Sequence, residues 1–324
     1  MSHEIETMAF AGQTPWHGLC VEVEPTLTAE QMMVAAGLDW KVVKRPIMYK
    51  VGKDSRRTIK DRFALVRDTD EQYLSLCGPK YQPVQNKDVF DFFHKFVDAG
   101  HMEMHTAGSL MDGKFVWALA KVGDSFTLPG SDKVEGYLLL MSPHEAGRSM
   151  VIQHTSVRVV CWNTLNMALG SGLKGGEGAV RLTHVRAFDD SVREQAEIAL
   201  GLSHEHLLSF KVAAEKLQEV KVDAELADEY FKTVFRLEVP VVSNDEEKKR
   251  DSRVLVKLRD ALEHGPGAQL PGTVGTAWGA LNAVTYVVDH QLGRDRAKVM
   301  RDNWLGYRGE TKRRALEEAL KLAA

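Results

Sequence analysis

The stretch that decides the fold of the N-terminal half is KVVKRPIMYKVGKDSRRTIKDRFALVR, residues 41–67. Two runs rich in β-branched, aromatic and basic residues flank a short polar segment that contains glycine. This pattern predicts strands over residues 40–51 and 57–67, joined by a turn at Gly52–Arg56. The stretch is therefore expected to form an antiparallel hairpin.

Two helices are expected beside this hairpin. Thr28 and Gln31 have the spacing of a capping box at the start of a helix over residues 29–36. Asn86 is expected to cap a second helix, KDVFDFFHKFVDA, whose apolar residues recur at helical spacing. The helices and the strands around them are typical of an α+β protein.

Further strands are expected after the second helix. Residues 102–123 have the pattern of a hairpin with its turn at Met111–Gly113, and VEGYLLLM has the composition of another strand. A last strand, AVRLTHVRAF, follows the glycine-rich segment GSGLKGGEG. The N-terminal half is therefore expected to hold mostly antiparallel strands.

The C-terminal part differs in its periodicity. From Asp189 onward every periodic segment has the helical repeat. The expected helices span residues 190–201, 204–219, 223–235, 245–263, 276–291 and 308–322. Residues 264–275 are too rich in glycine and proline for a helix and are expected to form a loop. We therefore expect a domain boundary near residue 188, with an α+β core domain over 1–188 and a helical domain over 189–324.

Composition indicates a globular protein that does not cross a membrane. The chain has 324 residues, 44% of them hydrophobic, and a net charge of −3. No run approaches the roughly 18 consecutive apolar residues that a membrane helix needs, and the N-terminus lacks the pattern of a secretion signal. The three cysteines, Cys20, Cys77 and Cys161, are far apart, which argues against disulfides and zinc ligation. The expected location is the cytoplasm of a bacterial host cell.

The stretch MVIQHTSVRVVCWNTLNMALG, residues 150–170, begins like a buried strand but carries polar residues in its middle. Because side chains alternate between the two faces of a strand, His154, Ser156 and Arg158 share one face. That face is either solvated or contacts a ligand, and spacing alone does not separate the two alternatives.

Several segments together resemble a known family. They are TPWHGL, AAGLDWKVVKRP, VRVVCWNTLNMAL, RLTHV, WGALNAVTYVVDH and NWLGYRGETKRRALEEAL. They look like the phage/plasmid-like proteins built on domain of unknown function 932 (DUF932), and the similarity runs over nearly the full chain. The resemblance implies that the protein is encoded by a phage, a plasmid or an integrated element and that it takes part in replication or recombination. It implies no settled activity.

The residues do not form a recognisable catalytic centre. Cys161 and His154 project to opposite faces of one strand, so only His184 could approach the thiol, and a structural role for Cys161 is favoured. No metal-ligand spacing occurs in the sequence. The alternative function is a metal-dependent nuclease that uses His144, His154 or His184 together with Glu145 or Asp189. The segment GSGLKGGEG leads into a strand rather than a helix, so a linker is favoured over a phosphate-binding loop.

Charge distribution is more informative than net charge. Residues 41–67 carry ten basic residues against Asp54 and Asp61, whereas residues 1–38 carry five glutamates and no lysine or arginine. The cations either pair with these acids or form a cationic ridge, with Trp40, Tyr49 and Phe63 as stacking surfaces for bases. A second basic segment spans Arg294–Arg314 and holds eight cations against three acids.

We therefore expect a mobile-element protein that binds nucleic acid, single-stranded DNA above all, in annealing or recombination, without a cofactor and as a homo-oligomer. The metal-dependent enzyme above and interference with a host factor remain the alternatives. The expected contacts with nucleic acid are Lys41, Lys44, Arg45, Lys50, Arg56, Arg57, Lys60, Arg62, His154, Ser156 and Arg158. No catalytic residue and no metal ligand is assigned.

Overall fold

The structure is a computed structural model of the chain. It describes residues 5–11, 21–53, 55–98, 102–158, 163–165, 179–182, 205, 207–237, 245–293, 302–303 and 306–324. The chain divides into two compact units that interleave along the sequence. Unit 1 comprises Met1–Gly123, Tyr137–Gln153 and Gly178–Leu202, and unit 2 comprises Asp124–Gly136, His154–Glu177 and Ser203–Ala324. The expected boundary near residue 188 lies outside the described residues.

The fold is α+β, as the sequence predicted. The larger sheet has eight strands in the order β10-β9-β8-β7-β6-β1-β2, with β11 also pairing with β9. The strands are β1 (Ile5–Ala11), β2 (Val21–Val23), β6 (Met102–Leu110), β7 (Phe115–Leu128), β8 (Asp132–Pro143), β9 (Met150–Arg158), β10 (Asn163–Leu165) and β11 (Ala179–Leu182). β1 and β2 are parallel, whereas β6 is antiparallel to both β1 and β7.

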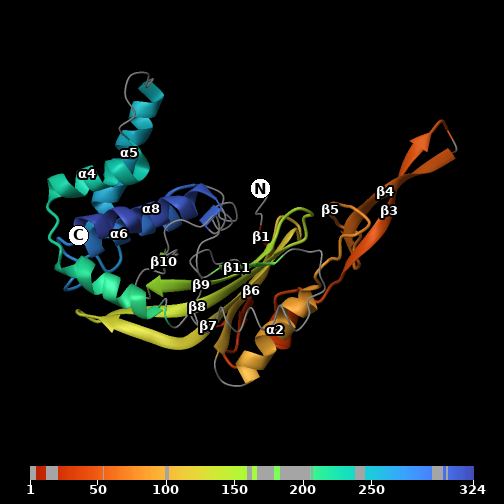
Figure 1. Cartoon of the computed structure of the whole chain (residues 1–324), viewed down its shortest axis with the longest axis horizontal. Helices are drawn as coiled ribbons and strands as arrows, with labels where there is room; N and C mark the ends of the chain where they lie inside the picture. The colour runs from red at the N-terminus through yellow and green to blue at the C-terminus, as the bar shows by residue number, and fades with distance from the viewer. Residues whose placement is uncertain are drawn as a thin grey trace. The chain divides into compact units, whose positions relative to one another are not determined.

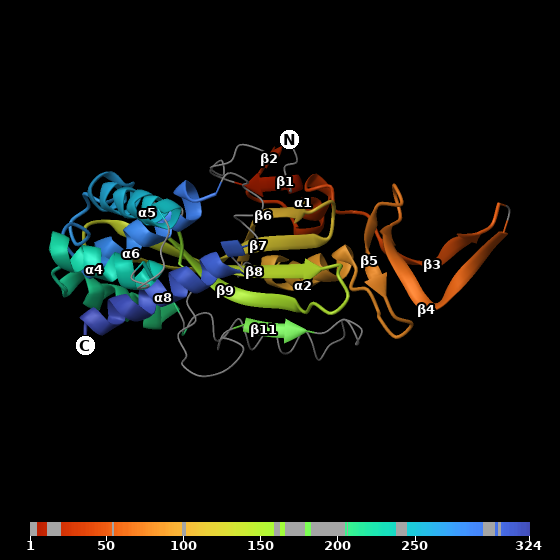
Figure 2. The same cartoon turned by 90° about the horizontal axis from the view of Figure 1, so that it is seen from above.

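The smaller sheet contains the hairpin expected from residues 41–67. It has the order β3-β4-β5, formed by β3 (Val42–Val51), β4 (Ser55–Arg67) and β5 (Tyr73–Cys77), and both pairings are antiparallel. β5 pairs only with Phe63–Val66 of β4. The rest of the hairpin is a two-stranded ribbon that extends away from the helices of unit 1 (Figures 1 and 2).

Helices α1 (Ala29–Ala35) and α2 (Asn86–Asp98) contact each other and β6. The capping box is confirmed. The backbone N–H of Gln31 donates to Thr28 Oγ1, and the backbone N–H of Thr28 donates to Gln31 Oε1. The expectation that Asn86 caps α2 is wrong. Its side-chain amide donates to Leu38 O at 2.9 Å, and its Oδ1 lies 2.9 Å from His144 Nε2, so it fixes neighbouring segments instead.

Unit 2 is built on helices, as the C-terminal periodicity predicted. They are residues 207–219, α4 (Ala224–Phe235), α5 (Asp245–His264), α6 (Ala277–Tyr286), the π-helix η1 (Val287–Gln291) and α8 (Tyr307–Leu322). α6 contacts α4, α5 and α8, and residues 277–285 are all buried. The expected helix 190–201 lies outside the described residues. None of the described helices is both long and apolar enough to cross a membrane.

Candidate nucleic-acid interface

The ribbon beyond the reach of β5, residues 46–62, is called the basic arm below. It carries six cations, Lys50, Lys53, Arg56, Arg57, Lys60 and Arg62, and all six are exposed. No ion pair joins any of them to another residue that the structure describes. A two-stranded ribbon buries little apolar surface by itself, so these side chains contribute little to packing. The basic arm therefore presents its charge to solvent.

The strand register places like charges opposite each other near the end of the basic arm. Lys50 pairs with Arg56, and Tyr49 pairs with Arg57. Paired residues on antiparallel strands project to the same face, and like charges placed directly opposite are destabilising. The fold alone gives no reason for this arrangement, whereas a bound polyanion would neutralise both cations.

An irregularity in β4 exposes further cations. Pro46 pairs with Phe63, and Met48 pairs with Thr58. Between these two pairs, β3 has one residue, whereas β4 has four, residues 59–62. Asp61 adopts a positive φ of 57° inside this bulge. A bulge bends its strand and redirects side chains, and Lys60 and Arg62 are exposed on either side of Asp61.

At the base of the hairpin, Lys44 and Arg45 are engaged by neighbouring groups, in contrast to the cations of the basic arm. Arg45 forms an ion pair with Glu71 at 2.8 Å, and the hydrogen bond from Arg45 lowers the pKa of the Glu71 carboxyl. Lys44 Nζ donates to Pro79 O at 3.1 Å and lies over the Phe63 ring. Of the expected nucleic-acid contacts, Arg45 is thus engaged within the protein, and Lys41 is exposed.

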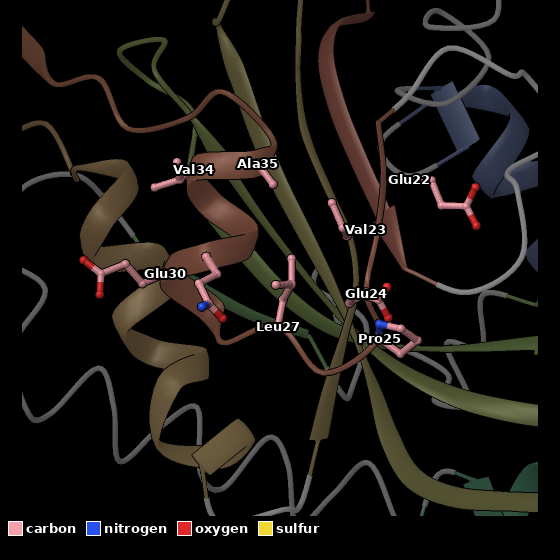
Figure 3. Close-up of a pocket in the computed structure, with 9 residues that line it drawn as sticks. Glu22, Val23, Glu24, Pro25, Leu27, Glu30, Val34 and Ala35 are labelled. Carbon is pink, nitrogen blue, oxygen red and sulfur yellow. The ribbon is translucent and has the colours of Figure 1, made fainter.

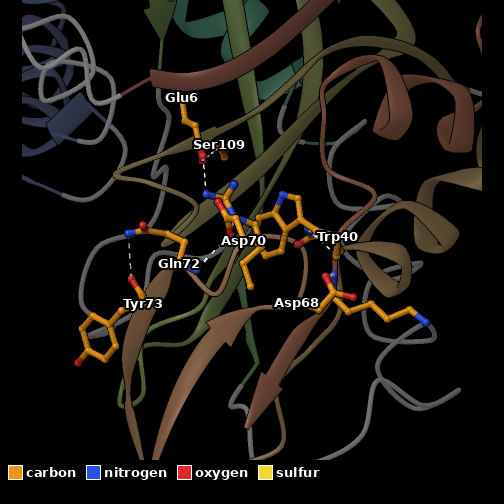
Figure 4. A network of polar contacts seen from close by, with 10 residues as sticks. Glu6, Trp40, Asp68, Asp70, Gln72, Tyr73 and Ser109 are labelled. Carbon is orange, nitrogen blue, oxygen red and sulfur yellow. Dashed lines mark hydrogen bonds and ion pairs between the residues drawn. The ribbon is translucent and has the colours of Figure 1, made fainter. Parts of the chain in front are cut away.

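Arg67 is the most buried cation of the hairpin. It lies 2.6 Å from Glu6 and 2.9 Å from Asp70, and Ser109 donates a hydrogen bond to Glu6 (Figure 4). Burial lowers the pKa of Arg67, but the hydrogen bonds and charges of the two carboxylates outweigh burial and raise it. The alternative that some cations pair with the acidic N-terminal segment is therefore confirmed for this residue.

The three aromatic residues expected to stack on bases have different environments. Trp40 is buried, with the guanidinium of Arg67 5.2 Å from its ring centroid, so it offers no stacking surface. Phe63 is half-buried beneath Lys44. Tyr49 is 48% exposed and lies on the basic arm. The stacking hypothesis thus holds only for Tyr49 among the three.

Ser156, one of the expected contacts with nucleic acid, is buried. Ser156 is 1% exposed, and its hydroxyl lies 3.2 Å from His154 Nε2. His154 is half-buried. The side chain of Arg158 lies outside the described residues, so its expected phosphate contact stays a prediction.

The second basic segment serves the fold of unit 2 where the structure describes it. Lys312 is buried and lies 2.8 Å from Asp289 Oδ1. Arg308 donates to Val288 O, and burial lowers its pKa. Arg314 donates to Val234 O at 2.6 Å. Arg308, Lys312 and Arg314 are thus engaged by neighbouring groups of unit 2.

The residues of the enzyme alternative do not converge where the structure describes them. His144 is buried against Asn86, and Glu145 forms an ion pair with Arg148 at 2.6 Å. His184, Asp189, Cys161 and the glycine-rich segment lie outside the described residues. Within the described part of the chain, no group of three or more histidine, cysteine or acidic side chains could hold a metal ion.

The fold and the interface define an α+β protein with a cationic two-stranded arm. Comparison with known families adds that residues 73–317 match the family described as domain of unknown function DUF932, and the chain belongs to this family. No curated protein and no solved structure matches the chain. The matched region begins at Tyr73, so it leaves out β1, β2, α1, β3 and β4, and with them the basic arm.

Proposed function

We propose that this protein binds nucleic acid through the phosphate backbone, using the basic arm. The observation that carries the proposal is the set of six exposed arm cations, two of which oppose each other in the strand register without a described acidic partner. The phosphate groups along a nucleic-acid strand would neutralise these six cations. The condensed counterions of the phosphates are then released, which makes binding favourable. Backbone contacts of this kind position a protein without reading base sequence.

Single-stranded DNA is the preferred ligand in this proposal. Tyr49 is exposed between the arm cations, and base stacking on an aromatic side chain requires unpaired bases. A two-stranded ribbon also fits the major groove of duplex DNA, so duplex binding is the outcome against which the preference is measured. Annealing or recombination on a mobile element, without a cofactor, is the role that this ligand preference supports.

The test is a titration of labelled single- and double-stranded DNA at several salt concentrations. Replacing Arg56, Arg57 and Lys60 by Glu should weaken binding for all sequences. It should also reduce the slope of log affinity against log salt by about two units, since each lost contact with a single strand removes about 0.7. Circular dichroism should show an unchanged fold, because the three side chains are exposed.

A control variant makes the same change in charge on unit 2. Lys216, Lys221 and Arg253 are exposed and lie outside the basic arm. Their replacement by Glu should leave the salt slope near that of the unmodified protein. An unchanged slope in the folded arm variant, or an equal loss in the control, would show that the arm does not bind the phosphate backbone.

A further inference from the structure

A second surface of unit 1 has the opposite charge. It is a pocket of about 930 Å³ between β2 and α1 (Figure 3). Its apolar part is formed by Val23, Pro25, Leu27, Val34 and Ala35, and Glu22, Glu24 and Glu30 surround it. We call it the acidic pocket. Its volume is in the range of pockets that bind a small ligand or a few side chains.

The acidic pocket lies beside a sheet edge. β2 is the last strand of the eight-stranded sheet, and no strand in the described part of the chain pairs with its outer side. Val21 on this strand is 58% exposed. Unpaired amide and carbonyl groups at a sheet edge can accept an added extended segment, while neighbouring pockets take its side chains.

The charge around the acidic pocket specifies the kind of segment. The three glutamates are exposed, and no ion pair joins them to any residue that the structure describes. The charge of Glu30 acts on Lys87 electrostatically. The ammonium group of Lys87, however, donates a hydrogen bond to Asp91 Oδ1 at 3.2 Å. The pocket therefore suits an extended segment in which cations accompany exposed apolar side chains.

The basic arm has this combination. Met48 is 54% exposed, Tyr49 and Ile59 are exposed as well, and the six cations surround them. The arm is also a strand ribbon, so its backbone can pair with the free edge of β2. Within one copy, the arm extends away from β2 and α1 (Figure 2).

We propose that the basic arm of one copy docks in the acidic pocket of a second copy. Two different surfaces meet in such a contact, so the first copy keeps a free pocket and the second keeps a free arm, and further copies can add to form rings or filaments. The contact does not depend on nucleic-acid binding, and it is tested without nucleic acid.

The experiment is a charge exchange followed by sedimentation velocity at low salt. The pocket variant replaces Glu22, Glu24 and Glu30 by Lys, and the arm variant is the Arg56, Arg57 and Lys60 to Glu triple. The unmodified protein should associate with rising concentration. Each variant alone should have a self-association dissociation constant raised by about tenfold or more, because like charges then face each other.

Mixing the two variants provides the decisive measurement. The acidic arm of one variant faces the basic pocket of the other, and the reciprocal contact keeps its original charges, so the equimolar mixture should associate again. A control with Glu219, Glu229 and Glu263 replaced by Lys, all exposed on unit 2, should associate like the unmodified protein. If the pocket variant unfolds, the Glu to Gln triple replaces it and should weaken association without reversing it.

Three outcomes would overturn the proposal. The unmodified protein could stay monomeric at every concentration, association could survive both charge reversals, or the mixture of variants could fail to associate. Each outcome is separate from the proposed function, because the pocket variant keeps all six arm cations and should bind DNA with the original salt slope.

Discussion

Individual residues of the same type have different roles in this hairpin. Arg67, at the base of β4, is buried between two carboxylates and Trp40, whereas Arg56 and Arg57 on the same strand are exposed. The sequence predicted the excess of cations but not which of them are neutralised. The partners are distant along the chain, since Glu6 lies 61 positions before Arg67, and local spacing carries no sign of such pairs.

Residue patterns were also misleading where polar groups are buried. The period of β9 correctly placed Ser156 beside His154, but alternation does not distinguish a solvated face from one covered by other segments. Trp40 was expected among stacking surfaces because it adjoins the cations in sequence, yet its ring is covered by Arg67 and by His144 at 5.4 Å. In both cases the burial depends on tertiary contacts.

At the residue scale, Tyr49 provides a test of strand preference. Tyr49→Ala should weaken binding of single-stranded DNA by about 1–3 kcal/mol, since one stacked base is lost, and should change duplex binding much less. Tyr49→Phe keeps the ring and should bind normally. Tyr73 is 47% exposed on β5, outside the basic arm, so Tyr73→Ala serves as the control. Equal losses on both ligands would contradict the stacking role.

At the scale of elements, strong local signals were sufficient. The capping box of α1, the turn at Met111–Gly113 and the two strands of the hairpin were predicted because the residues that form them are neighbours in sequence. β1 was missed, although it lies inside the eight-stranded sheet, because its seven residues lack alternation and Met8–Ala11 are all buried. The π-helix η1 was expected as a continuation of α6, since both have helical periodicity.

The turn between β7 and β8 approaches Pro271 closely at Gly130, and a substitution there tests this contact. Gly130 and Gly147 both have φ of 88°, but a Cβ on Gly130 would lie 2.2 Å from Pro271 O, whereas nothing lies within 4 Å of a Cβ on Gly147. Gly147→Ala should lower the free energy of unfolding by about 1–2 kcal/mol, because of the backbone conformation alone. Gly130→Ala should cost a further 1–3 kcal/mol, roughly, from the clash. Urea denaturation measures both, and equal losses would contradict the close approach.

At the scale of the whole molecule, the two units are not consecutive halves of the chain. The segment Asp124–Gly136 belongs to unit 2, where Asp132 accepts a hydrogen bond from Trp278 Nε1 at 2.9 Å. Periodicity correctly separated strands from helices, but a contact between residues 146 positions apart has no local signature. A boundary drawn from the change in periodicity therefore does not assign this segment to the helical unit.

The two proposals make a joint prediction for the assembled protein, because they assign the same six cations to different partners. A saturating single-stranded oligonucleotide should compete with the acidic pocket for the basic arm, so the sedimentation coefficient of the assembly should fall toward that of one copy with bound DNA. Phosphates carry one charge per nucleotide along each strand and should outcompete three glutamates at low salt. An uncharged oligonucleotide analogue of the same length should leave the assembly intact. An assembly that binds the oligonucleotide to saturation and keeps its size would show that the arm does not serve both partners.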